Sequence, residues 1–92
     1  MRFGWDPQKD ASNRRKHGIT FAQARSVFED PLAVSVPDPD ASEERWVTIG
    51  HAEHLGLVVV VHTYREAGGV ERMRIISARK ATRRERRQYE EG

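Results

Sequence analysis

The chain has 92 residues, of which 33% are charged and 37% are hydrophobic, and it contains no cysteine. This length predicts a single domain, residues 1–92, with a small core. The absence of cysteine excludes disulfides and thiolate metal sites. No apolar run approaches the roughly 18 residues of a membrane span, and the first residues lack the apolar segment of a signal peptide. We therefore expect a soluble, cytoplasmic protein with no membrane partner.

The net charge of +2 is the sum of three parts of the chain that differ in charge. Residues 1–28 carry a net charge of +4, residues 29–64 carry −6, and residues 65–92 carry +4. If the fold brings the two ends together, they form a basic surface that could bind a phosphate backbone. A solvated, salt-bridged surface without a binding function explains the same charges.

The first predicted elements are a short edge strand, residues 2–5, and a helix. Asp6 can accept hydrogen bonds from the first free amides as the N-cap, and Pro7 suits the first helical position. The helix ends after residues 16–17 because Gly18 is typical of the position that follows a helix.

A second helix begins directly after the first. Thr20 and Gln23 form a capping box, and apolar residues recur on one helical face at positions 21, 24, 27 and 28. The Asp30-Pro31 pair ends this helix.

The rest of the chain predicts four strands and a final helix. The strands cover residues 32–36, 45–51, 57–65 and 71–79, and Ala67-Gly68-Gly69 forms the last turn. A capping box of Thr82 and Glu85 then begins a C-terminal helix that extends through Tyr89. Because helices and strands do not alternate regularly, we expect an α+β fold. Its antiparallel β-sheet should carry two N-terminal helices and one C-terminal helix.

The last two strands bring basic residues together. With a four-residue loop, residues 66–69, Arg65 lies opposite Val70, and Arg65, Arg72 and Arg74 then share one face of the sheet. Three guanidinium groups cannot be buried together, so they face solvent or an anion. A bulge or a one-residue slip would split the set, and an ordinary surface is the alternative interpretation.

Two further groups of basic residues lie at helix ends. Arg79 ends the last strand, and the helix that follows carries Arg83, Arg84, Arg86 and Arg87. Their guanidinium groups could each donate two hydrogen bonds to the oxygens of an RNA phosphate. Lys16 and His17 lie at a helix C-terminus, where the helix dipole favours a cation. His17 could act as an acid or base and Lys16 could neutralise a phosphate. Solvated helix faces and simple C-capping are the alternatives, and we interpret His62 as a packed histidine.

The acidic residues do not suggest a metal site. They cluster in the proline-broken segment 38–44 and form no spaced set with histidines, which disfavours a two-metal nuclease. Gly68-Gly69 is interpreted as a turn and not as a phosphate-binding loop. We therefore expect no metal and no cofactor.

Nearly the whole chain resembles the BrnT family of toxins from type II toxin–antitoxin pairs. No single motif is diagnostic, but the order and spacing of the motifs are specific. The matching segments are residues 3–9, 13–21, 28–32, 44–45 with 49–50, 58–65 and 72–86.

The resemblance implies a RelE-like fold and a ribonuclease that arrests translation. It also implies a BrnA-type antitoxin with a ribbon-helix-helix DNA-binding domain, and repression of the shared operon when the complex binds operator DNA. By motif position, Arg65 and Arg79 correspond to the family's functional arginines, and Lys16-His17 matches its Lys-His-Gly stretch. We expect these four residues to be catalytic and the RNA to be bound by Arg45, Arg72, Arg74, Arg83, Arg84 and Arg86.

RNA can be cleaved without a metal because its own 2′-OH can attack the adjacent phosphate. The protein then needs only to position the strand, stabilise charge on the phosphate oxygens and move protons. Arginines suit the second task but are poor bases, so these residues do not identify the side chain that transfers the protons. A non-catalytic RNA- or protein-binding module on the same fold remains the rival hypothesis.

Overall fold

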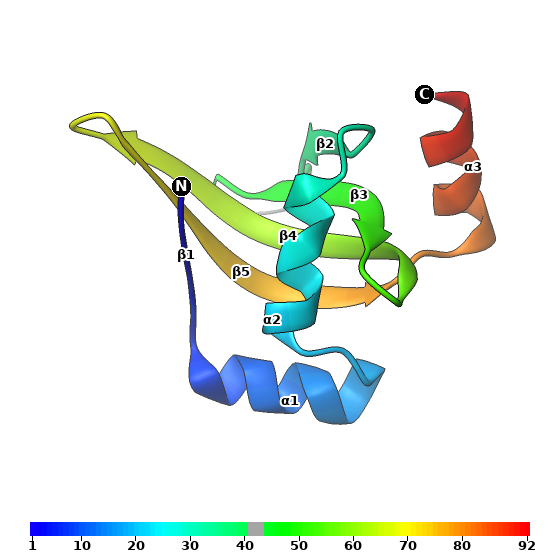
Figure 1. Cartoon of the computed structure of the whole chain (residues 1–92), viewed down its shortest axis with the longest axis horizontal. Helices are drawn as coiled ribbons and strands as arrows, with labels where there is room; N and C mark the ends of the chain where they lie inside the picture. The colour runs from blue at the N-terminus through cyan, green and yellow to red at the C-terminus, as the bar shows by residue number, and fades with distance from the viewer. Residues whose placement is uncertain (41–43) are drawn as a thin grey trace.

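The computed structural model describes residues 1–40 and 44–92 (Figure 1). Part of the acidic segment predicted at 38–44 therefore lies outside the described residues. The elements follow the predicted order of strands and helices. They are β1 (Arg2–Trp5), α1 (Pro7–His17), α2 (Phe21–Ala24), the 3₁₀ helix η1 (Arg25–Glu29), β2 (Val34–Pro37), β3 (Trp46–Ala52), β4 (Gly56–Ala67), β5 (Val70–Lys80) and α3 (Arg83–Glu91).

The five strands form one sheet in the order β1-β5-β4-β3-β2. Three neighbouring pairs are antiparallel, whereas β1 and β5 are parallel. The predicted α+β fold with an antiparallel sheet is confirmed, and the sheet departs from that prediction only in this one parallel pair. A parallel pair needs a long crossover, and the whole chain between β1 and β5 provides it. The sequence of a four-residue strand does not indicate whether the neighbouring strand is parallel or antiparallel to it.

The predicted caps of α1 are confirmed. Asp6 accepts a hydrogen bond from the amide of Gln8 at 2.9 Å, and Gly18 adopts a φ of 72°. The second helix differs from the prediction, because α2 is short and continues as the 3₁₀ turn η1. Its capping box at Thr20 is present, but the Ser26 hydroxyl donates to the Gln23 carbonyl at 2.8 Å. Such local hydrogen bonds compete with a regular helix.

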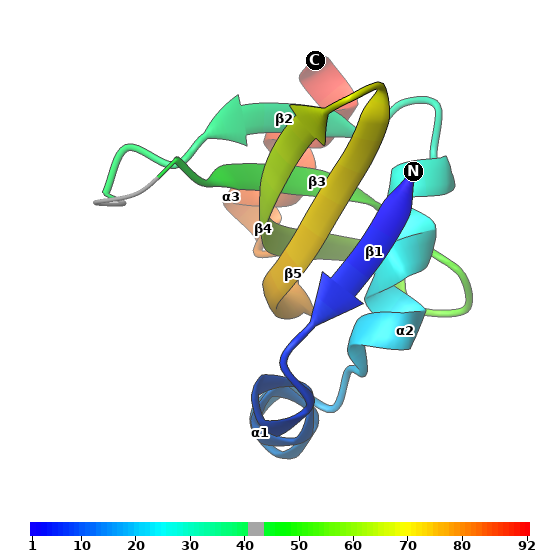
Figure 2. The ribbon, with the colours of Figure 1, turned by 90° about the vertical axis from the view of Figure 1, so that its left-hand side faces the viewer.

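The two sides of the sheet are covered differently. Helices α2 and η1 cover one side and enclose the main core, whereas α1 lies at the edge of the sheet and α3 covers part of the other side (Figure 2). The main core consists of Ile19, Phe21, Ala24, Val27, Ala52, Val58, Val60, Ile75 and Ala78. Under α3 lies a smaller cluster of Ile49, Leu57 and Val59. The side that carries α3 is called the open face below.

The β4–β5 hairpin is longer than predicted. Ala67 pairs with Val70, so the turn contains only Gly68 and Gly69, whose φ values are 59° and 77°. Two consecutive positive φ angles are what the tightest hairpin turn requires, and glycine adopts them without strain. The four-residue loop was therefore wrong, and the register is shifted by two residues.

Helix α1 closes the part of the β5 edge that β1 does not reach. The buried side chain of Asn13 donates from Nδ2 to the Ala78 carbonyl at 2.8 Å and accepts from the Ala78 amide at 3.1 Å. The same Nδ2 donates to the Ile19 carbonyl at 3.0 Å. This contact fixes α1, and with it Lys16 and His17, beside β5.

Candidate nucleic-acid interface

Three arginines from three neighbouring strands lie in one row across the open face. Arg72 of β5 pairs with Arg2 of β1 on one side and with Arg65 of β4 on the other. All three residues are exposed. Neighbouring strands are about 4.8 Å apart, so these positive charges start from closely spaced backbone positions. Arg2, Arg72 and Arg65 are called the arginine row below.

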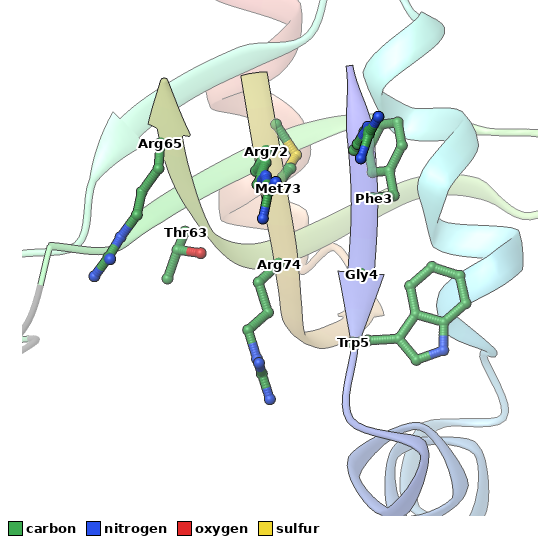
Figure 3. A pocket seen from close by; sticks show the side chains of 9 residues that line it. Phe3, Gly4, Trp5, Thr63, Arg65, Arg72, Met73 and Arg74 are labelled. Atoms are coloured by element: carbon green, nitrogen blue, oxygen red, sulfur yellow. The ribbon is translucent and has the colours of Figure 1, made fainter. Parts of the chain in front are cut away.

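The predicted grouping of Arg65, Arg72 and Arg74 on one face is confirmed. A register shift of two residues leaves each side chain on its original face, and Arg74 now pairs with Thr63. The β-bulge lies between Val61 and His62, outside this set. Figure 3 shows Arg65 and Arg74 on the side of the strands opposite Trp5.

The arginine row borders an open depression of about 570 Å³. Its lining comes from β1, β4 and β5 and consists of Arg2, Phe3, Gly4, Trp5, Thr63, Arg65, Arg72, Met73 and Arg74 (Figure 3). The two basic ends of the sequence therefore meet here, because β1 and β5 are paired. The predicted basic surface exists.

In the part of the chain that the structure describes, these arginines have no acidic partner. Within residues 1–40 and 44–92, no carboxylate oxygen lies within 4.0 Å of the side-chain nitrogens of Arg2, Arg65, Arg72 or Arg74. The nearby acidic pair, Glu66 and Glu71, lies on the opposite side of the hairpin with Tyr64. Partial burial and these carboxylates raise the pKa of Tyr64. The uncompensated positive charge points to an anionic ligand.

Arg79 lies on the same face but is separated from the arginine row. It pairs with Val59, six residues before Arg65 on β4, which corresponds to roughly 20 Å along the strand. Its guanidinium donates to Glu85 through two hydrogen bonds of 2.6 and 2.8 Å. These bonds lower the pKa of Glu85 to about 2 and raise that of Arg79. The structure thus brings Arg79 together with α3 and not with Arg65.

Lys16 and His17 line a second, smaller depression between α1 and β5. Its volume is about 280 Å³, and its lining is Lys9, Ser12, Asn13, Lys16, His17, Ile76 and Ser77. Ile76 lies two residues after Arg74 on β5, so this notch adjoins the arginine surface along the strand. Lys9 and Ser12 were not among the predicted site residues. Their three- and four-residue spacing to Asn13 and Lys16 places them on one helical face, which is the signal that could have revealed them.

The other predicted RNA-binding residues are spread more widely. The α3 arginines 83, 84 and 86 are exposed at the end of the open face distant from the hairpin. Arg45 is half-buried directly before β3, and its Nε has no hydrogen-bond partner among the described residues. Strand alternation places Arg45 on the same side as Val47, which is the open face.

Arg2 was not among the predicted site residues. Its place in the row depends on the parallel pairing of β1 with β5, and nothing in a four-residue strand indicates that partner.

His62 is buried, as expected for a packed histidine. Among the described residues, no three His, Asp or Glu side chains lie close enough together to hold a metal ion. No helix within the described part of the chain has the length and apolar character needed to cross a membrane.

The fold and the site define a small α+β protein whose exposed sheet face carries a basic surface. The profile of the family described as "Ribonuclease toxin, BrnT, of type II toxin-antitoxin system" matches residues 5–85. The chain therefore belongs to the BrnT family of ribonuclease toxins. It is similar to the crystal structure of the Brucella abortus ribonuclease toxin BrnT, with 27% sequence identity and a TM-score of 0.65. The match covers 90% of this chain and 99% of that one. A comparison with curated proteins finds no match.

Proposed function

We propose that this ribonuclease toxin binds RNA on the open face and cleaves it without a metal ion, and that the cleavage arrests translation. The observation that carries the proposal is the arginine row, whose exposed charges have no carboxylate partner among the described residues. Because RNA is the proposed substrate, we place its action in the cytoplasm.

The proposed reaction is an internal displacement. The 2′-oxygen attacks the adjacent phosphorus and loses its proton, the bond to the 5′-oxygen breaks, and the leaving oxygen gains a proton. The products are a 2′,3′-cyclic phosphate and a 5′-hydroxyl. Arg65, Arg72 and Arg74 stabilise the charge on the phosphate oxygens, which are the groups that gain charge as the displacement proceeds.

The proton carrier in this proposal is His17. An imidazole changes its protonation state near neutral pH, whereas arginines are poor bases. His17 lines the notch beside β5 together with Lys16, and Lys16 neutralises a phosphate there. His62 is not a candidate because it is buried on the side of the sheet opposite the arginine row, against Phe28.

Arg79 is proposed to act by positioning. Its bonds to Glu85 hold the N-terminal end of α3 against the sheet. The same Glu85 accepts a hydrogen bond from the Thr82 amide at 2.9 Å and so caps the helix. Arg79 thereby sets where the α3 arginines, 83, 84 and 86, meet the RNA. Arg45 extends the basic surface on the β3 side.

A type II toxin implies a cognate antitoxin. We propose that this antitoxin is of the BrnA type, with a ribbon-helix-helix domain, and that it covers the basic surface of the toxin. A dimer of such domains would bind a two-fold symmetric operator. The toxin would then contact operator DNA only through the complex, which represses the shared operon.

Inducible expression with and without the antitoxin gene tests the proposal. Toxin alone should stop growth and yield fragmented RNA in extracts, and co-expression of the antitoxin should restore both growth and intact RNA. Intact RNA in growth-arrested cells would contradict cleavage as the cause.

A further inference from the structure

Strand β1 forms one wall of the larger depression on the open face. Its residues alternate between the two sides of the sheet. Phe3 packs toward the helix-covered side, where its ring lies 5.5 Å from that of Phe28. Arg2 and Gly4 therefore face the other side, opposite Arg72 and Arg74. These two residues of β1 line the depression.

Arg2 adds a third positive charge to a row that already holds two. Like charges placed directly opposite on neighbouring strands destabilise a sheet, and no acidic side chain among the described residues compensates Arg2, Arg72 or Arg65. The row spans two strand spacings, about 10 Å. A chain of phosphates that runs across the strands would contact the three arginines in succession.

Gly4 is not required by the fold. It is not among the residues with positive φ, and a Cβ built at this position meets no atom within 4 Å. Glycine inside a strand is unfavourable compared with residues that carry a side chain. What glycine does provide is space, because any side chain at this position would project into the depression beside Arg74.

The size of the depression favours a single strand. Its volume of about 570 Å³ falls in the range of pockets that enclose one small molecule. One or two nucleotides of a flexible strand could enter it. A duplex presents two backbones on a rigid helix and is too wide to do so.

We propose that Arg2 binds a phosphate of single-stranded RNA beside Arg72 and Arg65, and that Gly4 leaves open the space for the adjoining sugar-phosphate unit. The proposal rests on the proposed function, because it concerns the same RNA surface. It assigns β1 to the substrate site, in addition to the β4–β5 hairpin.

Fluorescence anisotropy with a labelled 2′-O-methyl RNA of about 12 nucleotides tests this directly, since the probe lacks the 2′-OH nucleophile and stays intact. For the wild-type protein, phosphate contacts of the four arginines that line the depression, Arg2, Arg65, Arg72 and Arg74, contribute about −3 to the slope of log affinity against log salt. Arg2→Ala should weaken binding and reduce the steepness of that slope by about 0.7. Arg14→Ala removes the same charge from an exposed position that lines neither depression, and the slope should stay as in the wild type.

Gly4→Val separates binding from folding. Valine is favoured in strands, so the melting temperature should be unchanged or higher. Binding of the single strand should weaken by roughly ten-fold or more because the side chain fills the occupied space. Gly4→Ala should give a smaller loss. The same probe annealed to its complement should show no dependence on residue 4.

The inference is overturned if Arg2→Ala and Gly4→Val bind like the wild type while Arg65→Ala weakens binding. That result would leave the proposed function intact. Equal sensitivity of the duplex to Gly4→Val would overturn the assignment to single-stranded RNA. A wild-type protein that neither binds nor cleaves RNA would overturn the proposed function and this inference together.

Discussion

At the scale of single residues, the buried side chains of His62 and Thr48 belong to a chain of polar contacts that reaches the surface at Ser35. The Nε2 of His62 lies 2.6 Å from Thr48 Oγ1, which lies 2.7 Å from Ser35 Oγ. Its Nδ1 lies 3.2 Å from the Thr63 carbonyl. A carbonyl can only accept, so Nδ1 carries the proton and Nε2 accepts from Thr48. Burial lowers the pKa of His62, which keeps the ring neutral in the core.

This burial predicts how stability depends on pH. The ordinary pKa of 6.5 applies to the unfolded chain, and the folded pKa is lower, so acid protonates the unfolded state first. The stabilising contribution is therefore complete above 6.5 and is lost as the pH falls below it. Glu85, with a pKa of about 2 in place of 4.5, adds a loss only below about 4.5.

Thermal unfolding between about pH 7.5 and pH 5 checks this, because Glu85 does not contribute in that window. The melting temperature of the wild type should fall toward pH 5, and the fall should be smaller in His62→Gln. His54→Gln, a change at an exposed histidine, should keep the wild-type profile. Parallel curves for the wild type and His62→Gln would show that another group controls the transition.

At the scale of elements, the contact between α1 and β5 holds the candidate site together. Asn13 replaces a neighbouring strand by bonding both the amide and the carbonyl of Ala78. Without it, the β5 edge beyond β1 would contain buried backbone groups without partners. The notch with Lys16 and His17 exists because α1 is fixed in this place.

Asn13→Ala should therefore destabilise the protein by about 3 kcal/mol, since buried backbone donors and acceptors at Ala78 lose their partners. Ser12→Ala, a change at the exposed residue before it, should alter the free energy of unfolding by less than about 0.5 kcal/mol. Chemical denaturation measures both. Equal stability of the two variants would show that α1 is held by other contacts.

At the scale of the whole molecule, charge is divided across the sheet. The basic N-terminal and C-terminal parts meet at β1 and β5, while the acidic middle part supplies β2 and β3 at the other edge. The basic surface continues over α3, whose arginines are exposed. An antitoxin that covers this surface would neutralise the charges that hold RNA.

Charge reversal should thus weaken the complex with the antitoxin. The double variant Arg83→Glu and Arg84→Glu should lose more affinity at low salt than at high salt, because salt already screens much of the attraction. Titration calorimetry at several salt concentrations measures this. If these changes and reversals at Arg65 and Arg74 all leave binding unchanged at every salt concentration, the antitoxin binds elsewhere.

Much of this architecture was predictable because it depends on neighbours in the chain. The capping boxes at Thr20 and Thr82 follow from local spacing, and two-residue alternation was enough to group Arg65 with Arg72 and Arg74. Contacts between distant segments were not predictable. The pairing of β1 with β5 determines the place of Arg2. The second role of Glu85, as the partner of Arg79, appears only when the chain turns between β5 and α3.

Cleavage of a defined single-stranded RNA in excess EDTA, with analysis of the new ends, tests the central claim most directly. The wild-type protein should remain active and leave 2′,3′-cyclic phosphate or its hydrolysis product. Arg65→Ala should cleave at least about ten-fold more slowly, since one charge-stabilising contact is worth on the order of 3 kcal/mol in a transition state, whereas Arg14→Ala should match the wild type. The account is contradicted if activity disappears with EDTA and returns with magnesium, or if folded Arg65→Ala cleaves at the wild-type rate.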